Sequence, residues 1–157
     1  MSPVRFAGLY TEMVAISQRS GLPLVLLETN TASCNGFLGL SDSMLAALWN
    51  LDLGLQLAST GFTHAMIHLG GQQAYYNVCL ANSWLLPDLT AQQTFMAPPW
   101  NASAPFMWTV APPMFAILIS SEVLGPSNQA RVADLGINNN STHMAGYVIY
   151  ENNLPVR

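Results

Sequence analysis

The spacing of apolar residues in the first half of the chain predicts a helix, a strand, a second helix and a second strand. Residues 24–27 are four consecutive aliphatic side chains, which predicts a parallel strand buried on both faces, and residues 63–69 predict another strand. Around the first strand, apolar residues recur every three or four positions, as on one face of a helix. These two predicted faces are Phe6, Leu9, Met13 and Ile16, and then Met44, Leu48, Leu51, Leu55 and Ala58.

Local signals mark the ends of both predicted helices. Ser2 followed by Pro3 is a good helix start, because a hydroxyl can cap the helix and proline fits its first turn. Ser41-Asp42-Ser43 offers a second cap and a negative charge at a helix N-terminus, and glycines at Gly21 and Gly61 are expected to end the two helices. A strand, a helix and a strand in succession predict a right-handed βαβ unit with a parallel sheet.

The second half of the chain changes character. Residues 70–105 are irregular and longer than an ordinary connection, and a helix is predicted over residues 114–124. Residues 129–137 and 143–151 are rich in β-forming side chains around a run of three asparagines, which predicts a hairpin. The expected fold class is therefore α/β at the front, followed by the beginning of an antiparallel β domain.

The composition of the 157 residues is unusual for a soluble domain. There are four arginines, no lysine and eight acids, so that 8% of the residues are charged, against about 25% in ordinary domains. The hydrophobic fraction is 51%. Such a surface suggests a piece of a larger protein, in which further chain covers the apolar faces.

Charge excludes some classes of partner. The net charge of −4 without a basic cluster argues against nucleic acid, since phosphate binding needs grouped lysine and arginine. No membrane partner is expected either, because the apolar residues 106–124 are interrupted by Pro112, Pro113 and Glu122. The N-terminal residues lack the apolar core of a signal peptide, which leaves the compartment open.

The sequence predicts no metal site and no cofactor. Cys34 and Cys79 match neither a zinc motif nor a disulfide framework, and their disulfide state stays open. His64 and His68 have no second ligand at metal spacing.

Glu28 is the most informative single residue. It closes the first predicted strand and opens a polar loop of small residues, residues 29–36. Parallel α/β folds place their catalytic groups at such strand ends. A structural ion pair at the end of the strand is the alternative interpretation.

A set of motifs in one order resembles glycoside hydrolase family 79, which holds β-glucuronidases and heparanase-like enzymes, and the fungal members are the most similar. The motifs are Leu27-Glu28-Thr29-Asn30, Ser33-Cys34-Asn35-Gly36, Gly39-Leu40-Ser41-Asp42-Ser43, Ala47-Leu48-Trp49, His68-Leu69-Gly70-Gly71-Gln72, Tyr75-Tyr76-Asn77, Pro98-Pro99, Asn101-Ala102-Ser103, Trp108-Thr109-Val110, Tyr147-Val148-Ile149-Tyr150-Glu151-Asn152 and Pro155-Val156-Arg157. They cover most of the chain.

The resemblance implies a TIM (β/α)₈ barrel followed by a β-sandwich-like domain. Residues 1–125 would hold the last two βα units of the barrel, and residues 126–157 the beginning of the β domain. Glu28 would be the nucleophile of a retaining mechanism at the end of the seventh strand. A second glutamate, on the fourth strand, would be the acid/base, and these 157 residues do not contain that strand. We therefore expect the chain alone to be inactive.

The resemblance also implies residues that bind a uronic-acid sugar. The loop after Glu28 would approach the sugar carboxylate, His68 would line the pocket, and one of the two tyrosines after the second strand would donate a phenol hydrogen bond. The alternatives are an ordinary Asn/Gly turn for the loop and structural burial for one tyrosine ring. The predicted substrate-binding residues are Asn30, Ser33, Asn35, Gly36, His68, Tyr75 and Tyr76.

One segment of the chain departs from the family pattern, and more than one function stays open. Relatives join the motifs on either side of residues 78–96 with far fewer residues, so we interpret this segment as an atypical insert, with a mis-spliced gene model as the leading hypothesis. Three functions remain: a fragment of a retaining β-glucuronidase acting on a carbohydrate glucuronide, a non-catalytic uronate-binding remnant, or a gene fragment without function. The resemblance implies a secreted parent enzyme, and the compartment of this chain stays open.

Overall fold

The computed structural model describes residues 2–32, 40–41, 43–68, 96–97, 109–110, 112–137 and 143–156. They fall into two compact units. Unit 1 comprises Met1–Leu27, Leu51–Met66 and Ile119–Arg157, and unit 2 comprises Glu28–Asn50 and Ile67–Leu118. The predicted division between residues 125 and 126 refers to a larger fold and stays a prediction.

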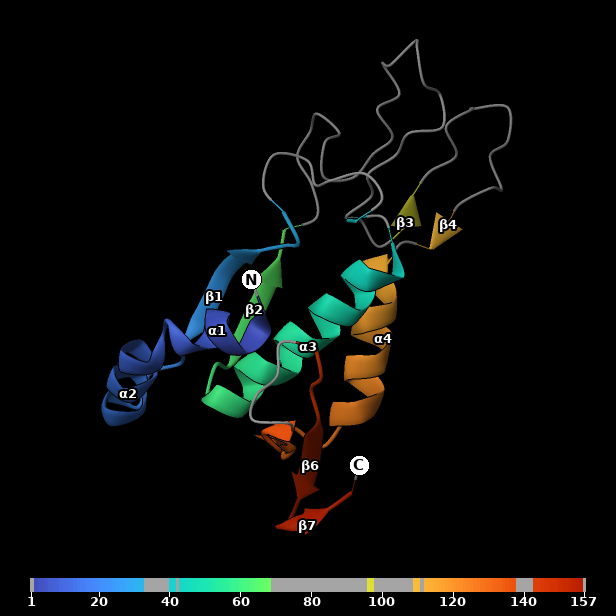
Figure 1. Ribbon diagram of the computed structural model, residues 1–157. Helices are drawn as coiled ribbons and strands as arrows, with labels where there is room; N and C mark the ends of the chain where they lie inside the picture. The colour runs from blue at the N-terminus through green and yellow to red at the C-terminus, as the bar shows by residue number, and fades with distance from the viewer. Residues whose placement is uncertain are drawn as a thin grey trace. The chain divides into compact units, whose positions relative to one another are not determined.

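Strands β1 (Val25–Thr29) and β2 (His64–Ile67) are neighbours in a two-stranded sheet (Figure 1). The Thr63 N–H donates to the Leu24 carbonyl oxygen at 2.9 Å, and the His68 N–H donates to the Thr29 oxygen at 2.8 Å. Because the pairing advances in the same direction along both strands, the strands are parallel. Helix α3 (Met44–Thr60) connects them, which makes the strand–helix–strand unit that the sequence predicts. Two strands do not define a barrel, and the (β/α)₈ barrel stays a prediction.

The prediction that the first strand is buried on both faces is wrong. Leu26 is 9% exposed, whereas Leu27 is 80% exposed. Successive side chains of a strand point to opposite faces. Within β1, Leu26 is the buried side chain, and Val25 and Thr29 are partly buried.

The first predicted helix is two helices, α1 (Pro3–Gly8) and α2 (Thr11–Ser20). The break follows Gly8, a poor helix former, and the Thr11 hydroxyl donates to the Gly8 carbonyl oxygen at 2.9 Å. Helix α2 ends at Gly21 in the left-handed conformation, φ 64°, as predicted.

The predicted apolar face of these helices is also wrong. Because the chain turns after Gly8, the periodicity does not continue from one helix into the next. The buried residues are Pro3, Ala7 and Val14, while Leu9, Met13 and Ile16 are exposed.

Helix α3 buries a different face from the one predicted. Met44 and Leu48 are 59% and 56% exposed, and Leu55 is buried as expected. The sequence of α3 is apolar nearly all round, so that several faces fit the helical spacing equally well. The residues of α3 that are buried are Ala46, Ala47, Asn50, Leu53, Leu55, Gln56 and Leu57.

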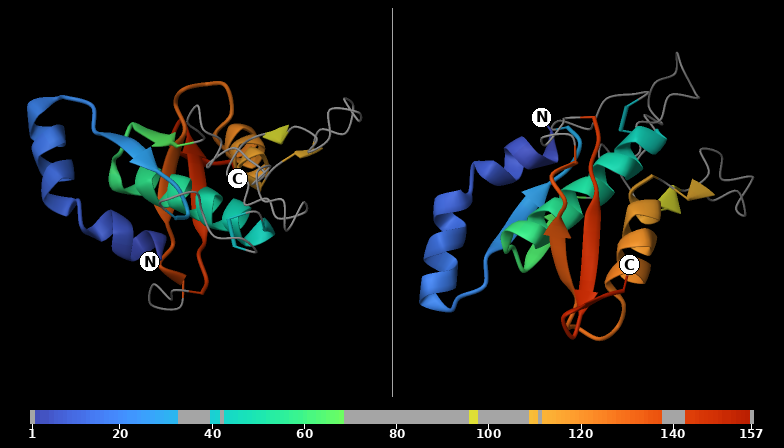
Figure 2. Two further views of the ribbon diagram at one scale, coloured as in Figure 1. Left: turned by 90° about the horizontal axis from the view of Figure 1, so that it is seen from above. Right: turned by 60° about the horizontal axis from the view of Figure 1, so that its bottom comes forward.

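An antiparallel sheet of β5 (Arg131–Asp134), β6 (Tyr147–Glu151) and β7 (Leu154–Pro155) belongs to unit 1, with β6 in the centre (Figure 2). Ile149 of β6 is 2% exposed and contributes to the core. Asn152 and Asn153 both have positive φ, which suits the two-residue turn between β6 and β7. The predicted hairpin is confirmed, with shorter strands than expected.

The remaining elements are β3 (Met96–Ala97) and β4 (Thr109–Val110), an antiparallel pair in unit 2, and helix α4 (Pro112–Leu124). Helix α4 begins two residues before the predicted start, at Pro112. Proline has no backbone N–H, and the first turn of a helix does not need one, because the N–H groups there have no intrahelical acceptor. Within the described ranges, no helix combines the length and the apolar character needed to cross a membrane.

Candidate functional site

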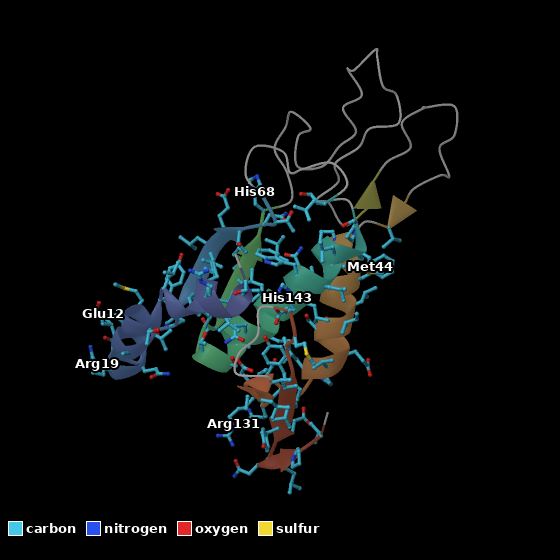
Figure 3. The ribbon with its side chains drawn as sticks, in the orientation of Figure 1. Glu12, Arg19, Met44, His68, Arg131 and His143 are labelled. Atoms are coloured by element: carbon cyan, nitrogen blue, oxygen red, sulfur yellow. The ribbon has the colours of Figure 1, made fainter. Side chains whose placement is uncertain are left out.

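Glu28 and His68 meet where the parallel strands β1 and β2 end. The His68 Nδ1 atom lies 3.5 Å from the Glu28 Oε1 atom, and the side chains of His68 and Glu28 are 31% and 68% exposed. His68 is the residue directly after β2, and Figure 3 labels it at this end of the strand. Carboxyl ends of parallel strands share one edge of a sheet. The register of β1 and β2 therefore brings the predicted nucleophile and a predicted pocket residue together.

Asn30 joins the segments that follow the two strands. Its Nδ2 atom donates to the His68 carbonyl oxygen at 2.7 Å, and its Oδ1 atom accepts the Thr31 N–H at 2.7 Å. Since the His68 N–H also donates to the Thr29 oxygen, both backbone polar groups of His68 are bonded to the β1 segment. The strand ends are thus held together at the residue beside Glu28.

The chain after β1 is also bonded to the segment that precedes α3. The hydroxyl oxygens of Thr31 and Ser41 lie 2.8 Å apart, and Ser41 is fully buried. The sequence predicted a helix cap at Ser41-Asp42-Ser43. Ser43 directly precedes α3, and its hydroxyl donates to the Leu40 carbonyl oxygen at 2.7 Å.

Chemically, an exposed carboxylate beside an imidazole can act as a nucleophile, a base or a hydrogen-bond acceptor. The imidazole and the carboxylate form an ion pair when His68 is protonated. Among the residues that the structure describes, no group of three or more histidine, cysteine, aspartate or glutamate side chains could hold a metal ion.

The structure brings together three of the predicted site residues, Glu28, Asn30 and His68. The other predicted residues lie outside the described part of the chain, as do both cysteines and most of the predicted insert at 78–96. These other site residues are Ser33, Asn35, Gly36, Tyr75 and Tyr76.

A second polar cluster, which the sequence did not predict, joins α3 to β6 within unit 1. The Tyr147 hydroxyl lies 2.5 Å from Asp52 Oδ1 and 3.0 Å from Gln56 Oε1. A phenol has one proton, and the nearer, charged oxygen of Asp52 is its stronger acceptor. Asp52 and Tyr147 are 95 positions apart, and no local pattern links such residues.

Burial and charge shift the pKa of both partners in this cluster. Burial raises the pKa of Asp52, the hydrogen bond from Tyr147 opposes that rise, and the negative charge of Asp134 adds to it. The pKa of Tyr147 is raised well above 10.0, first by burial, then by its hydrogen bond to Asp52 and by the charges of Asp52 and Asp134. The cluster therefore favours a protonated phenol.

Unit 1 also contains a cleft of about 510 Å³. None of the predicted site residues lines it. Ser59 and Thr60 are among its lining residues, but their hydroxyls donate within α3, to the carbonyl oxygens of Gln56 at 2.8 Å and of Leu57 at 2.9 Å. The lining residues are Gln18, Ala58, Ser59, Thr60, Gly61, Phe62, Thr63, Leu124, Gly125, Asn128, Ala130, Arg131 and Val132.

Comparison with known proteins gives two partial matches. The chain is 38% identical over 66 residues to a β-glucuronidase of Neurospora crassa, a match that covers 42% of this chain and 12% of that protein. It is 40% identical over 55 residues to a β-glucuronidase of Aspergillus niger, covering 35% of this chain and 10% of that protein. No family model and no solved structure matches. Over part of its length, the chain is thus related to fungal β-glucuronidases, and it spans a small share of theirs.

Proposed function

We propose that the chain is part of a retaining glycoside hydrolase of β-glucuronidase type, of glycoside hydrolase family 79, and that Glu28 is its nucleophile. One observation carries this proposal. In a chain with two partial matches to β-glucuronidases, the exposed carboxylate of Glu28 stands at the carboxyl end of a parallel strand, beside His68. Such ends are where α/β enzymes hold their catalytic groups.

In the proposed reaction, a lone pair of a Glu28 carboxylate oxygen attacks the anomeric carbon of the sugar. The bond from that carbon to the glycosidic oxygen breaks, and its electron pair leaves with the oxygen, which takes a proton from a second carboxylic acid. Water then hydrolyses the glycosyl ester on Glu28. The two carboxyl groups of a retaining pair stand about 5 Å apart.

We propose that none of these 157 residues supplies the second carboxyl group, the acid/base. Glu12 and Glu122 are exposed on α2 and α4, and Glu151 of β6 accepts a hydrogen bond from Ser127 at 2.7 Å. None of these three stands at the end of a parallel strand that the structure describes. Loss of general acid catalysis slows a reaction by roughly 10²–10⁴-fold. We therefore propose that the chain alone does not turn over ordinary glucuronides.

The proposed substrate is a glycan that ends in a uronic acid. The position of Asn30 supports this proposal, since its side chain lies where β1 and β2 end and bonds to the backbone of His68, which faces Glu28. We propose that this segment, with Ser33, Asn35 and Gly36, and one of Tyr75 and Tyr76 bind the carboxylate of the sugar.

Incubation with 4-nitrophenyl β-D-glucuronide tests the proposed inactivity. We expect no release of nitrophenolate above the rate of a buffer blank. Release that is lost in Glu28→Gln would contradict the inactivity of the chain and would show that it holds a complete site.

A trapping experiment tests the nucleophile itself. In 2-deoxy-2-fluoro-β-D-glucuronyl fluoride, the leaving fluoride needs no proton, so attack by Glu28 does not require the missing acid. We expect the intact mass of the chain to rise by one 2-fluoroglucuronyl group, in Glu122→Gln as in the wild type, and not in Glu28→Gln. Glu122 is an exposed glutamate on α4 and serves as the matched control.

If the wild type is not labelled, calorimetry distinguishes the two alternative functions. If the wild type stays unlabelled but gives heat with millimolar glucuronic acid in calorimetry, the chain is a non-catalytic uronate-binding remnant. If it gives neither label nor heat, it is a fragment without this function. Both results contradict the proposed nucleophile.

A further inference from the structure

The hydrogen bonds around His68 have a consequence for Glu28 that goes beyond its role as nucleophile. The side chain of Glu28 is 68% exposed, and an exposed glutamate has several rotamers of similar energy. Nucleophilic attack needs one of them, because the attacking oxygen must lie in line with the bond that breaks. A neighbouring group that selects this rotamer would therefore raise the rate of attack.

We infer that His68 and Asn30 are positioning residues for Glu28, an inference that depends on the proposed function. His68 donates its Nδ1 proton to Glu28 Oε1 and fixes the carboxylate, and Asn30 fixes the backbone of His68. The observed distance of 3.5 Å is long for a hydrogen bond. Catalytic hydrogen bonds are often long without substrate and shorten in the complex.

The choice of nitrogen atom makes the inference specific. Nδ1 is the nitrogen nearer the backbone, and it is Nδ1 that faces Glu28. An asparagine at position 68 can present an N–H close to the place of Nδ1, whereas a glutamine presents its N–H farther out, near the place of Nε2. The two substitutions thus keep an amide but differ in which imidazole nitrogen they replace.

Asn30 has an equally specific test. Its Nδ2 donates to the His68 carbonyl oxygen, while its Oδ1 accepts the Thr31 N–H. Asparagine and aspartate have nearly the same shape. Asn30→Asp therefore keeps the bond to Thr31 and removes the bond to His68, where two oxygens would then face each other.

The rate of trapping by 2-deoxy-2-fluoro-β-D-glucuronyl fluoride tests both roles in the full chain. We measure the maximal labelling rate and the half-saturating probe concentration separately. Asn30→Asp, His68→Gln and His68→Phe are expected to lower the maximal rate about tenfold or more. The two substitutions at His68 are expected to leave the half-saturating concentration within about twofold. His68→Asn is expected to stay within about threefold of the wild-type maximal rate. Asn128→Asp, the same change at an exposed residue far along the chain, is the control and should label at the wild-type rate.

The outcomes separate this inference from the proposed function. If the wild type is not labelled on Glu28, both the proposed nucleophile and the positioning role are wrong. If it is labelled but His68→Asn and His68→Gln have equal maximal rates, or Asn30→Asp labels like the wild type, the positioning role alone is wrong. A role of His68 in substrate binding would instead raise the half-saturating concentration. Circular dichroism checks that each variant folds. Should Asn30→Asp fail to fold, the two amide substitutions at His68 decide the matter.

Discussion

Among single residues, the exposure of Glu28 matters most, because a substrate can reach an exposed carboxylate. Its carboxylate is 68% exposed, and its partner His68 is 3.5 Å away at the end of the neighbouring strand. An ion pair with an exposed carboxylate contributes little to stability. In the function that we propose, the pair instead positions the carboxylate of Glu28.

Asp52 gives a prediction for acidic and neutral pH. Burial raises the pKa of this carboxyl above its ordinary 3.8, so the folded chain binds the proton more tightly than the unfolded chain. The free energy of unfolding then falls as the pH rises above about 4, until the raised pKa of Asp52 is passed. We expect the wild type to lose stability relative to Asp52→Asn from pH 4 toward neutrality, measured by urea unfolding. A stability difference that is constant over this range would contradict the burial of Asp52.

Tyr147 gives a prediction for alkaline pH. Its pKa is raised in the folded chain, so above pH 10 the unfolded tyrosine loses its proton while the folded one keeps it. We expect Tyr147→Phe to be about 1 kcal/mol less stable than the wild type at pH 8, because Asp52 loses a donor. That deficit should shrink as the pH rises above 10, measured by urea unfolding. A deficit that grows above pH 10 would mean that the phenol ionises more readily in the folded chain than in the unfolded chain, which would contradict the raised pKa.

The sequence predicted some of these residues and not others, for a physical reason. Four aliphatic residues before Glu28 are a local signal, and they place it correctly at a strand end. The contact with His68 depends on the register of two strands about 40 positions apart, and the bond from Tyr147 to Asp52 depends on how β6 packs on α3. Neither arrangement leaves a periodic trace in the chain.

At the level of secondary structure, side chains of the same helix, α3, are expected to contribute very differently to stability. Leu57 is 1% exposed and Leu48 is 56% exposed, although both are leucines of the same helix. We expect Leu57→Ala to lower the free energy of unfolding by about 2–5 kcal/mol, and Leu48→Ala to change it by less than about 0.5 kcal/mol. Urea unfolding of both variants measures this. Equal costs would mean that the face predicted from the spacing, which includes Leu48, is the buried one.

Two glycines of the same region are expected to change the free energy of unfolding in opposite directions when each is replaced by alanine. Gly61, just after α3, has φ 109°, and a Cβ atom there would lie 3.1 Å from Gln18 Nε2 and 3.2 Å from Val14 Cγ1. Gly54 lies within α3, and nothing is within 4 Å of a Cβ there. We expect Gly61→Ala to cost about 1–3 kcal/mol and Gly54→Ala to stabilise by about 0.5–1 kcal/mol. Thermal unfolding of both variants checks the signs, and a stabilising Gly61→Ala would contradict the turn.

The order of the elements follows from local signals, whereas their buried faces do not. Gly21 and Gly61 end helices where the sequence predicts, and the β5–β6 hairpin follows from its β-forming residues. The buried face of α3 was predicted wrongly because a helix that is apolar nearly all round fits several faces. The buried face of α2 was predicted wrongly because the chain turns after Gly8, so the periodicity does not continue from α1 into α2. The faces are selected by what packs against them.

For the whole molecule, the aligned part of the chain is a small share of a fungal β-glucuronidase, 12% of the Neurospora crassa protein and 10% of the Aspergillus niger protein. A retaining glycosidase needs two carboxyl groups, and our account assigns one of them to this chain. Nucleophilic attack and turnover, which a complete enzyme combines, are therefore expected to be separate in this chain. The chain should show the first without the second.

The most direct measurement is the identification of the residue that carries the trapped sugar. After incubation with 2-deoxy-2-fluoro-β-D-glucuronyl fluoride, protease digestion and tandem mass spectrometry locate the added 2-fluoroglucuronyl group. The account predicts that it lies on Glu28, and that 4-nitrophenyl β-D-glucuronide is not hydrolysed by the same sample. A label on any other carboxylate, or none at all, would contradict the assignment of Glu28 as nucleophile.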